Sequence, residues 1–373
     1  MSTRPWSVFV VLAAFILVVG AACSAASGGA SPTATPEATH PPQLLPTTEP
    51  KPTVEMPALP TQGSAPSGAA PFELDSTVYK HPSGTFSFNP PAGWTPDEGR
   101  SGVVFTSPDE AGKLDFSVTN TGYQLDAASL EEYVKATEAN YFGSFSNYNQ
   151  DQYQFDKDKG TAQVSKSLTS DKGDRKVLTY YLQQGQGVYE FDFWANADVA
   201  ADYSDAYAKL LDTIKVNGDA VSSLPVYSFI NTFTDKNNLF QFEVPLSWTY
   251  AYDEGKNYYS DTFTSPDKNA FVENISYDDG TTFTKSDAGA TALNLLNKYY
   301  TNGAGDIKVT GDVVQSDGSE RLDWTSKQGG YSGQSFFETR GTTFLMLSLV
   351  SDDKYSDVYS SVFDNTVSTY KIP

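Results

Sequence analysis

The residues FSFNPPAGW at Phe86–Trp94 decide the fold, because a closely similar stretch, FQFEVPLSW, returns at Phe240–Trp248. The two copies share two alternating phenylalanines, a proline and a tryptophan at one constant spacing. Two shorter motifs recur at almost the same distance: FTSPD at residues 105–109 and 263–267, and YSDxY at residues 203–207 and 355–359. Self-similarity over the length of one domain predicts two tandem copies of a single fold.

The repeat sets the domain boundaries. We expect a first domain at residues 72–218, a short joint at 219–226 and a second domain at 227–373, each long enough to bury a core of its own. Both copies contain short alternating apolar runs that are separated by Asp, Lys and Gly turns. Each also has one amphipathic segment in the middle and one at the end. This order predicts an α+β fold, with an antiparallel sheet flanked by helices in each copy.

The helix boundaries follow from capping signals and apolar spacing. In the first copy, Ser129 with Glu132 three residues later matches a capping box, so we expect the middle helix to begin at Ser129. In the second copy we expect a middle helix over residues 286–300. The repeated YSDxY motif begins the closing helix of both copies.

These motifs resemble the PsbP-like superfamily, which includes an extrinsic photosystem subunit and bacterial lipoproteins that are not photosynthetic. The resemblance rests on the FxFxxPxxW start, the acidic DEG turns at Asp97–Gly99 and Asp253–Gly255, and the closing helix, and it covers Phe72–Pro373. It implies an α/β/α sandwich in each domain and an accessory or assembly role. Some photosystem members bind cations partly through histidine. Only His81 lies in a repeat here, so no metal ligand is carried over.

The N-terminus is typical of a secretory signal. A short start with Arg4 precedes an apolar run from Val8 to Gly20, which is shorter than the roughly 20 residues of a membrane-spanning helix. Ala21, Ala22 and Cys23 then resemble a lipobox, although Gly20 stands where leucine is usual. We therefore expect residues 1–23 to be a signal peptide and Cys23 to be lipidated. This would place the protein outside the cytoplasm on a bacterial membrane, at the cell surface or on the periplasmic face. An ordinary signal peptide or an uncleaved anchor is the alternative.

Residues 24–71 are rich in Ser, Thr, Ala and Pro and have almost no aromatic or branched apolar side chains. Such a segment cannot bury enough apolar surface to offset the entropy of ordering it. We expect a disordered tether between the lipid and the first domain.

Composition excludes several classes of function. Lys and Arg number 25 against 46 Asp and Glu, and the net charge of -21 disfavours nucleic-acid binding. With one cysteine and two histidines, the two copies cannot share thiol or imidazole chemistry. No GxSxG, HExxH, P-loop or GxGxxG motif is present. We therefore predict no catalytic residues, no cofactor and no metal.

Trp94 and Trp248 are the repeated residues that could contact a ligand. After a strand-ending proline, an indole can close one end of the core and donate its N–H to a nearby carbonyl. The alternative is a pair of stacking platforms, which the 23 tyrosines would suit as part of a carbohydrate-binding surface. The sequence favours a non-catalytic lipoprotein that binds a protein or an envelope component. A carbohydrate-binding surface protein and a secreted hydrolase with paired carboxylates are the alternatives.

Overall fold

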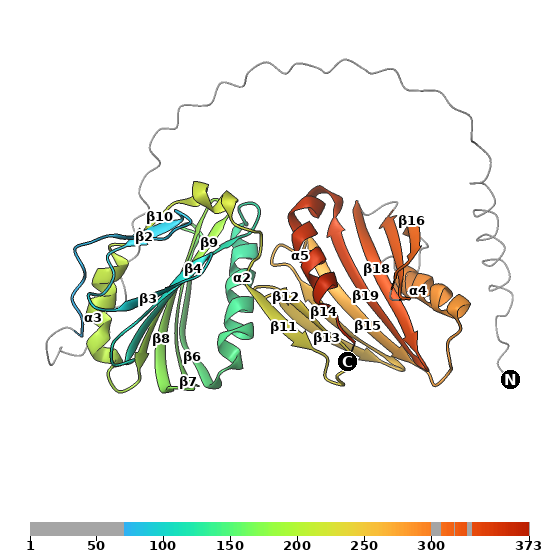
Figure 1. The fold of residues 1–373 in the computed structure, drawn as a ribbon, viewed down its shortest axis with the longest axis horizontal. Helices are drawn as coiled ribbons and strands as arrows, with labels where there is room; N and C mark the ends of the chain where they lie inside the picture. Colours follow the sequence, from blue (N-terminus) through green and yellow to red (C-terminus); the bar gives the residue numbers. More distant parts are fainter. Residues whose placement is uncertain (1–70, 300–306, 317, 327–329, 373) are drawn as a thin grey trace, which may run out of the picture. The chain divides into compact units, whose positions relative to one another are not determined.

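The computed structural model describes residues 71–299, 307–316, 318–326 and 330–372. The predicted signal peptide with Cys23, and the predicted tether up to residue 70, lie outside the described residues. The described residues, from Pro71 onward, belong to one compact unit. The described part of this unit contains two seven-stranded antiparallel sheets, one in each repeat (Figure 1).

The first sheet has the strand order β3-β4-β5-β9-β8-β7-β6. Its strands are β3 (Thr95–Glu98), β4 (Gly102–Thr106), β5 (Gly112–Asn120), β6 (Ser146–Asp156), β7 (Thr161–Ser170), β8 (Gly173–Gln184) and β9 (Gly187–Asn196). Two helices, α2 (Ala127–Asn140) and α3 (Ala200–Leu211), belong to this repeat, and a short turn, η1 (Phe142–Ser144), follows α2.

The second sheet repeats this order as β13-β14-β15-β19-β18-β17-β16. Its strands are β13 (Thr249–Gly255), β14 (Tyr258–Thr264), β15 (Ala270–Asp278), β16 (Ile307–Val314), β17 (Glu320–Ser326), β18 (Tyr331–Arg340) and β19 (Thr343–Asp352). Its helices are α4 (Lys285–Tyr299) and α5 (Ser356–Thr369), and η3 (Asp353–Tyr355) precedes α5.

The repeated phenylalanines lie in small separate sheets or, for Phe240, directly before one. Phe86 and Phe88 are in β2 (Phe86–Phe88), which pairs with β1 (Tyr79–Lys80) and β10 (Lys215–Val216). In the second repeat, β12 (Gln241–Pro245) pairs with β11 (Ile230–Thr234). Alternation along β2 and β12 points their phenylalanines into the core, where each is at most 3% exposed.

Helices cover both faces of each sheet. Leu210 and Leu211 of α3 pack with Leu114 and Phe116 of β5, whereas Leu130 and Val134 of α2 pack with residues of β7, on the opposite face. In the second repeat, α5 packs against Val272 and Leu347, and α4 against Ile275 and Met346 (Figure 1). The predicted α+β fold is therefore confirmed, with two tandem copies of an antiparallel sheet flanked by helices.

Two local predictions were wrong. The helix α2 begins at Ala127, and its N-cap is Asp126, whose side chain accepts a hydrogen bond from the Ser129 backbone N–H. The short acidic side chain one turn earlier therefore caps the helix in place of Ser129. The DEG segments are mainly strand rather than turn. Glu98 ends β3, and Asp253–Gly255 ends β13, because each segment pairs with the following strand.

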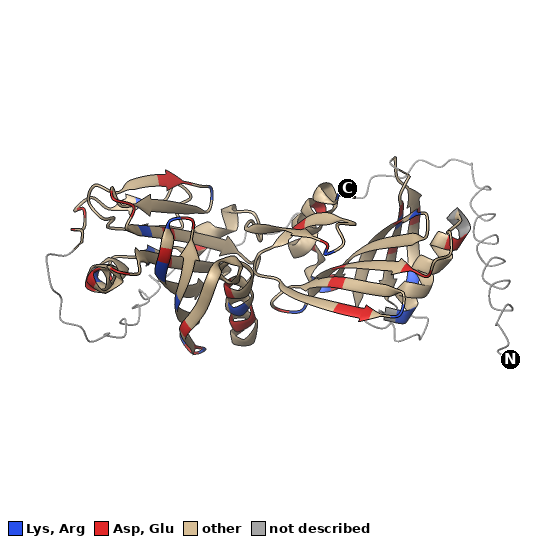
Figure 2. Ribbon diagram, turned by 90° about the horizontal axis from the view of Figure 1, so that it is seen from below, with Lys and Arg blue, Asp and Glu red and all other residues tan. Residues whose placement is uncertain are grey.

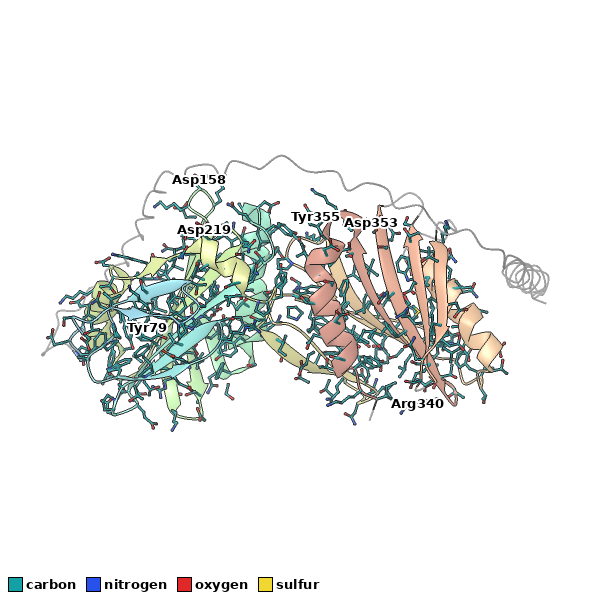
Figure 3. All side chains as sticks on the ribbon, turned by 45° about the horizontal axis from the view of Figure 1, so that its top comes forward. Tyr79, Asp158, Asp219, Arg340, Asp353 and Tyr355 are labelled. Carbon is teal, nitrogen blue, oxygen red and sulfur yellow. The ribbon has the colours of Figure 1, made fainter. Side chains whose placement is uncertain are left out.

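Hydrogen bonds and ring contacts join the two repeats. The Asn140 side chain of α2 donates to the carbonyl oxygens of Leu246, at 2.6 Å, and Trp248, at 2.9 Å. The ring of Tyr123 stacks on Tyr355, which is labelled in Figure 3, with centroids 4.9 Å apart. Part of the predicted joint forms η2 (Gly218–Ser223), in which Val221 is fully buried.

None of the helices in the described ranges has both the length and the apolar character that a membrane span requires.

Candidate functional site

The repeated tryptophans both lie in the core. Trp94 is 7% exposed and packs edge-on against Phe72, with centroids 5.2 Å apart. Trp248 is fully buried beside Tyr359 at 5.8 Å. Contrary to the expected N–H to carbonyl bond, the Trp248 Nε1 has no hydrogen-bond partner within the described residues. Buried indoles do not present a ring face to an outside ligand.

His81 is also enclosed. It is 2% exposed and stacks on Phe86 with centroids 4.7 Å apart. Its Nδ1 lies 2.6 Å from the Ser83 hydroxyl, and its Nε2 lies 3.1 Å from the Gly102 carbonyl oxygen. Both ring nitrogens therefore have partners inside the protein. Across the described ranges, no group of three or more His, Cys, Asp or Glu side chains is arranged to hold a metal ion.

A close group of ionisable side chains lies under α2 in the first repeat. Lys166 of β7 is fully buried, and its Nζ lies 2.6 Å and 2.8 Å from the two carboxylate oxygens of Glu138. The Tyr181 hydroxyl donates to Glu138 at 2.9 Å and is 3.2 Å from a carboxylate oxygen of Glu190. Asp192, on the same face of β9 as Glu190, accepts a hydrogen bond from Thr179 at 2.6 Å. We call Glu138, Lys166, Glu190 and Asp192 the ionic layer.

Burial changes the protonation of this layer. Desolvation raises the pKa of Asp192 to about 7, although the nearby Lys166 ammonium works in the opposite direction. Desolvation and the neighbouring Asp192 raise the pKa of Glu190 well above its usual value. Desolvation likewise lowers the pKa of Lys166, against the attraction of Glu138. The layer holds three carboxyl groups and one amine, and burial disfavours the ionised forms of Glu190 and Asp192.

The second repeat replaces the ionic layer with apolar and hydroxyl groups. The strand registers align Lys166 with Trp324, which is 1% exposed and donates from Nε1 to the Ser335 hydroxyl at 3.0 Å. The same registers align Asp192 with Ser348, whose hydroxyl lies 2.8 Å from that of Ser335. One fold therefore contains two chemically different cores at this place.

On the opposite face of the second sheet, buried polar residues stand where the first repeat has apolar ones. Asp261 of β14 and Asn274 of β15 are directly paired and at most 2% exposed. The first repeat has Val103 and Phe116 at these register positions. Asp261 Oδ2 and Asn274 Nδ2 have no hydrogen-bond partner in the described part of the chain. Desolvation raises the pKa of Asp261, while a hydrogen bond from Tyr250 lowers it in part.

Beside this polar pair is an exposed edge strand. Every residue of β13 from Thr249 to Glu254 is exposed, including Tyr250 at 40% and Tyr252 at 38%. Tyr250 donates to Asp261 at 2.7 Å and Tyr252 donates to Glu254 at 2.5 Å. The sequence motifs predicted a turn at Asp253–Gly255 and no strand here. The period-two spacing of Tyr250, Tyr252 and Glu254 is the pattern that indicates the strand.

Comparisons with known proteins give fold-level likenesses at low sequence identity. No protein-family model and no curated protein sequence matches the chain. Among solved structures, the cyanobacterial PsbP (CyanoP) of Synechocystis sp. is 15% identical and has a TM-score of 0.33, covering 39% of this chain and 94% of its own. LpqN, described as involved in cell envelope biogenesis of Mycobacterium tuberculosis, is 16% identical with a TM-score of 0.27, covering 37% of this chain and 90% of its own. The immunity protein TplEi of Pseudomonas aeruginosa is 13% identical with a TM-score of 0.21, covering 75% of this chain and 98% of its own.

Proposed function

We propose that this chain is a non-catalytic, membrane-tethered extracytoplasmic lipoprotein that binds a protein or a cell-envelope component. In this proposal the PsbP-like domains at residues 72–218 and 227–373, joined by 219–226, are the binding part. The observation that carries it is the exposed edge strand β13, which presents Tyr250 and Tyr252 to solvent. Tyrosine is enriched at protein interfaces, because its ring offers apolar area and its hydroxyl a hydrogen bond.

The ionic layer supports the non-catalytic part of the proposal. Lys166 and Glu138 bind each other through two contacts, and Thr179 holds Asp192. Both members of the Lys166–Glu138 pair are at most 4% exposed in their side chains. A general acid or base must come within hydrogen-bond reach of a substrate atom, whereas Glu138, Lys166 and Asp192 are buried and bonded to protein groups.

The anchor rests on the N-terminal sequence. Lipidation of Cys23 would tie the chain to the outer face of a bacterial membrane, and residues 24–71 would hold the domains away from it. We therefore expect Cys23→Ser to move the full chain from the membrane fraction to the soluble fraction. Labelled palmitate should enter the parent and not the variant. If both fractionate alike and neither takes up label, the anchor is wrong.

The binding role is tested by capture from the native membrane. The full chain, carrying an aromatic photo-crosslinker in place of Tyr252 on β13, should give one dominant cross-linked partner. The same crosslinker in place of Glu98, at the matching register position on β3, serves as the control. A polysaccharide adduct would favour the second candidate, a carbohydrate-binding surface protein, for which the same exposed tyrosines argue. No adduct at either site would count against a binding role.

A further inference from the structure

The edge strand β13 and its surroundings differ from the corresponding part of the first repeat. The strand registers place Pro96 and Glu98 of β3 where the second repeat has Tyr250 and Tyr252. The ring of Tyr250 packs against Phe263, with centroids 5.1 Å apart, and so keeps a fixed position while it remains 40% exposed. A rigid, half-exposed ring offers contact area at a low entropic cost.

A cation already lies on this surface. The Lys236 ammonium is 4.2 Å from the ring centroid of Tyr252 and 5.0 Å from that of Tyr259. It also contacts the Tyr252 hydroxyl and lies 3.2 Å from a carboxylate oxygen of Glu254. We call Tyr250, Tyr252, Tyr259 and Glu254 the tyrosine face. Two rings and a carboxylate around an ammonium form a cation-binding arrangement.

Buried polar groups next to the tyrosine face still have hydrogen-bonding capacity. Asp261 Oδ2 and Asp235 Oδ1 are acceptors without a partner in the described residues, and the two side chains are 2% and 3% exposed. Asp261 lies directly opposite Tyr252 in the β13–β14 register, and Asp235 accepts from the Tyr259 hydroxyl at 3.1 Å. Leaving such oxygens unpaired is unfavourable, so both acceptors keep hydrogen-bonding capacity directly behind the tyrosine face.

We propose that the tyrosine face binds arginine side chains of a basic polypeptide. Lys236 is half exposed, so its side chain can leave the face and give its place to an incoming guanidinium. A guanidinium stacks on a ring, presents five donors and can bind a carboxylate through two of them, whereas the ammonium of Lys236 is a single point charge. The exposed carboxylate of Glu254 supplies two acceptors that match those donors. Acidic residues also outnumber basic ones in both repeats, and this charge attracts a basic segment. Figure 2 marks the acidic and basic positions along the ribbon.

This inference rests on the proposed binding function and names the chemistry of its partner. The probes are two fluorescein-labelled peptides of equal charge and length, one with four arginines spaced by glycine and one with four lysines. Anisotropy titrations use the full chain in detergent at physiological salt. Coulomb attraction to an acidic protein depends mainly on the charge of the peptide, so a preference for arginine reports stacking and paired hydrogen bonds.

Tyr252→Ala and Glu254→Gln should each weaken the arginine peptide at least fivefold and reduce its preference over the lysine peptide. Glu98→Gln on β3 removes the same charge from an exposed edge strand of the first repeat and should change the affinity less than twofold. Lys236→Ala should strengthen binding, because it removes the internal competitor. The mutated side chains are exposed, and equal thermal unfolding of all variants would exclude loss of folding.

Equal weakening by Glu254→Gln and Glu98→Gln would show charge attraction alone and overturn the proposal. Binding of a neutral hexasaccharide that Tyr252→Ala abolishes, with no arginine preference, would also overturn it and assign the face to glycan. The proposed binding function is tested separately. If the partner cross-linked in the membrane binds Tyr252→Ala as well as it binds the parent, the tyrosine face is not the binding surface. The chain still binds that partner, so the proposed binding function stands.

Discussion

Asp192 is the residue whose protonation most directly links the core to pH. Its side chain is 3% exposed, and desolvation raises its pKa to about 7. In the unfolded chain the same carboxyl titrates near 4. Between these two values the folded state binds a proton that the unfolded state has lost, so folding stability decreases as pH rises.

We therefore expect Asp192→Asn to remove a pH-dependent part of the stability. Relative to the variant, the parent should lose up to about 1.4 kcal/mol per pH unit from pH ~4 to ~7, and the difference should level off above that. The asparagine oxygen can still accept the hydrogen bond from Thr179. Urea unfolding of both proteins at several pH values measures the difference. Parallel curves for the two proteins would show that Asp192 is ionised in the folded state throughout this range.

The Lys166–Glu138 pair allows a second comparison at the residue scale. Lys166→Met leaves the Glu138 carboxylate buried without its cation and should cost about 3–5 kcal/mol of the free energy of unfolding. Adding Glu138→Leu removes that carboxylate as well and should recover most of the loss. Apolar replacement is tolerated here because the second repeat already has Trp324 in place of Lys166.

Chemical denaturation of the two variants tests this order of stabilities. Lys172→Met, which breaks the exposed pair with Glu110, is the control and should leave stability unchanged. A double variant less stable than Lys166→Met would contradict this order and mean that Glu138 is stabilised by groups other than Lys166, such as the Tyr181 hydroxyl.

At the scale of the element, α2 depends on its N-cap. Asp126 accepts from the Ser129 backbone N–H at 2.8 Å, and this bond lowers the pKa of Asp126. Asp126→Ala should destabilise the first repeat by about 1 kcal/mol, whereas Asp126→Asn should cost less because asparagine also caps well. Thermal unfolding of both variants gives the comparison. Equal melting temperatures for Asp126→Ala and the parent would mean that packing against the sheet alone sets the start of the helix.

The ionic layer also depends on one element, because α2 covers it. Its members come from three elements, with Glu138 on α2, Lys166 on β7, and Glu190 and Asp192 on β9. On β9 the alternation of Glu190 and Asp192 with Tyr189, Phe191 and Phe193 is typical of a strand with one face in solvent. Only the packing of α2 over the sheet places this polar face inside the protein.

At the scale of the whole molecule, the contacts between the repeats determine cooperativity. Asn140 donates two hydrogen bonds across the repeats, to the carbonyl oxygens of Leu246 and Trp248, and Gly122 approaches Val358 so closely that an added Cβ would lie 2.5 Å from its Cγ1. We expect the two repeats to unfold in one calorimetric transition, with a van't Hoff enthalpy equal to the calorimetric enthalpy.

Asn140→Ala removes both bonds and should lower the stability of the whole chain by about 1–3 kcal/mol. Asn149→Ala, on the exposed strand β6, is the control and should have no comparable effect. Two separate transitions in the parent would show that each repeat folds independently, and Asn140→Ala would then affect only local packing.

The sequence alone determined the repeat, the α+β class and the antiparallel sheets, because these depend on local patterns. Alternating apolar residues, proline stops and turn residues act over a few positions, so FSFNPPAGW and FQFEVPLSW report the same core in both copies. The same local patterns predicted the wrong start for α2, where Asp126 caps the helix instead of Ser129. They also predicted turns at the DEG segments, where strand pairing overrides turn preference.

The chemistry of the two domains was decided by the tertiary structure. Lys166 and Glu138 are 28 positions apart, and nothing in their sequence neighbours marks either as buried. Asp261 and Asn274 meet only because β14 and β15 pair in one register, and Tyr250 and Tyr252 stay exposed only because β13 is at the sheet edge. Burial and pairing depend on which distant elements pack together, and residues of one type therefore acquire different roles in two copies of the same fold.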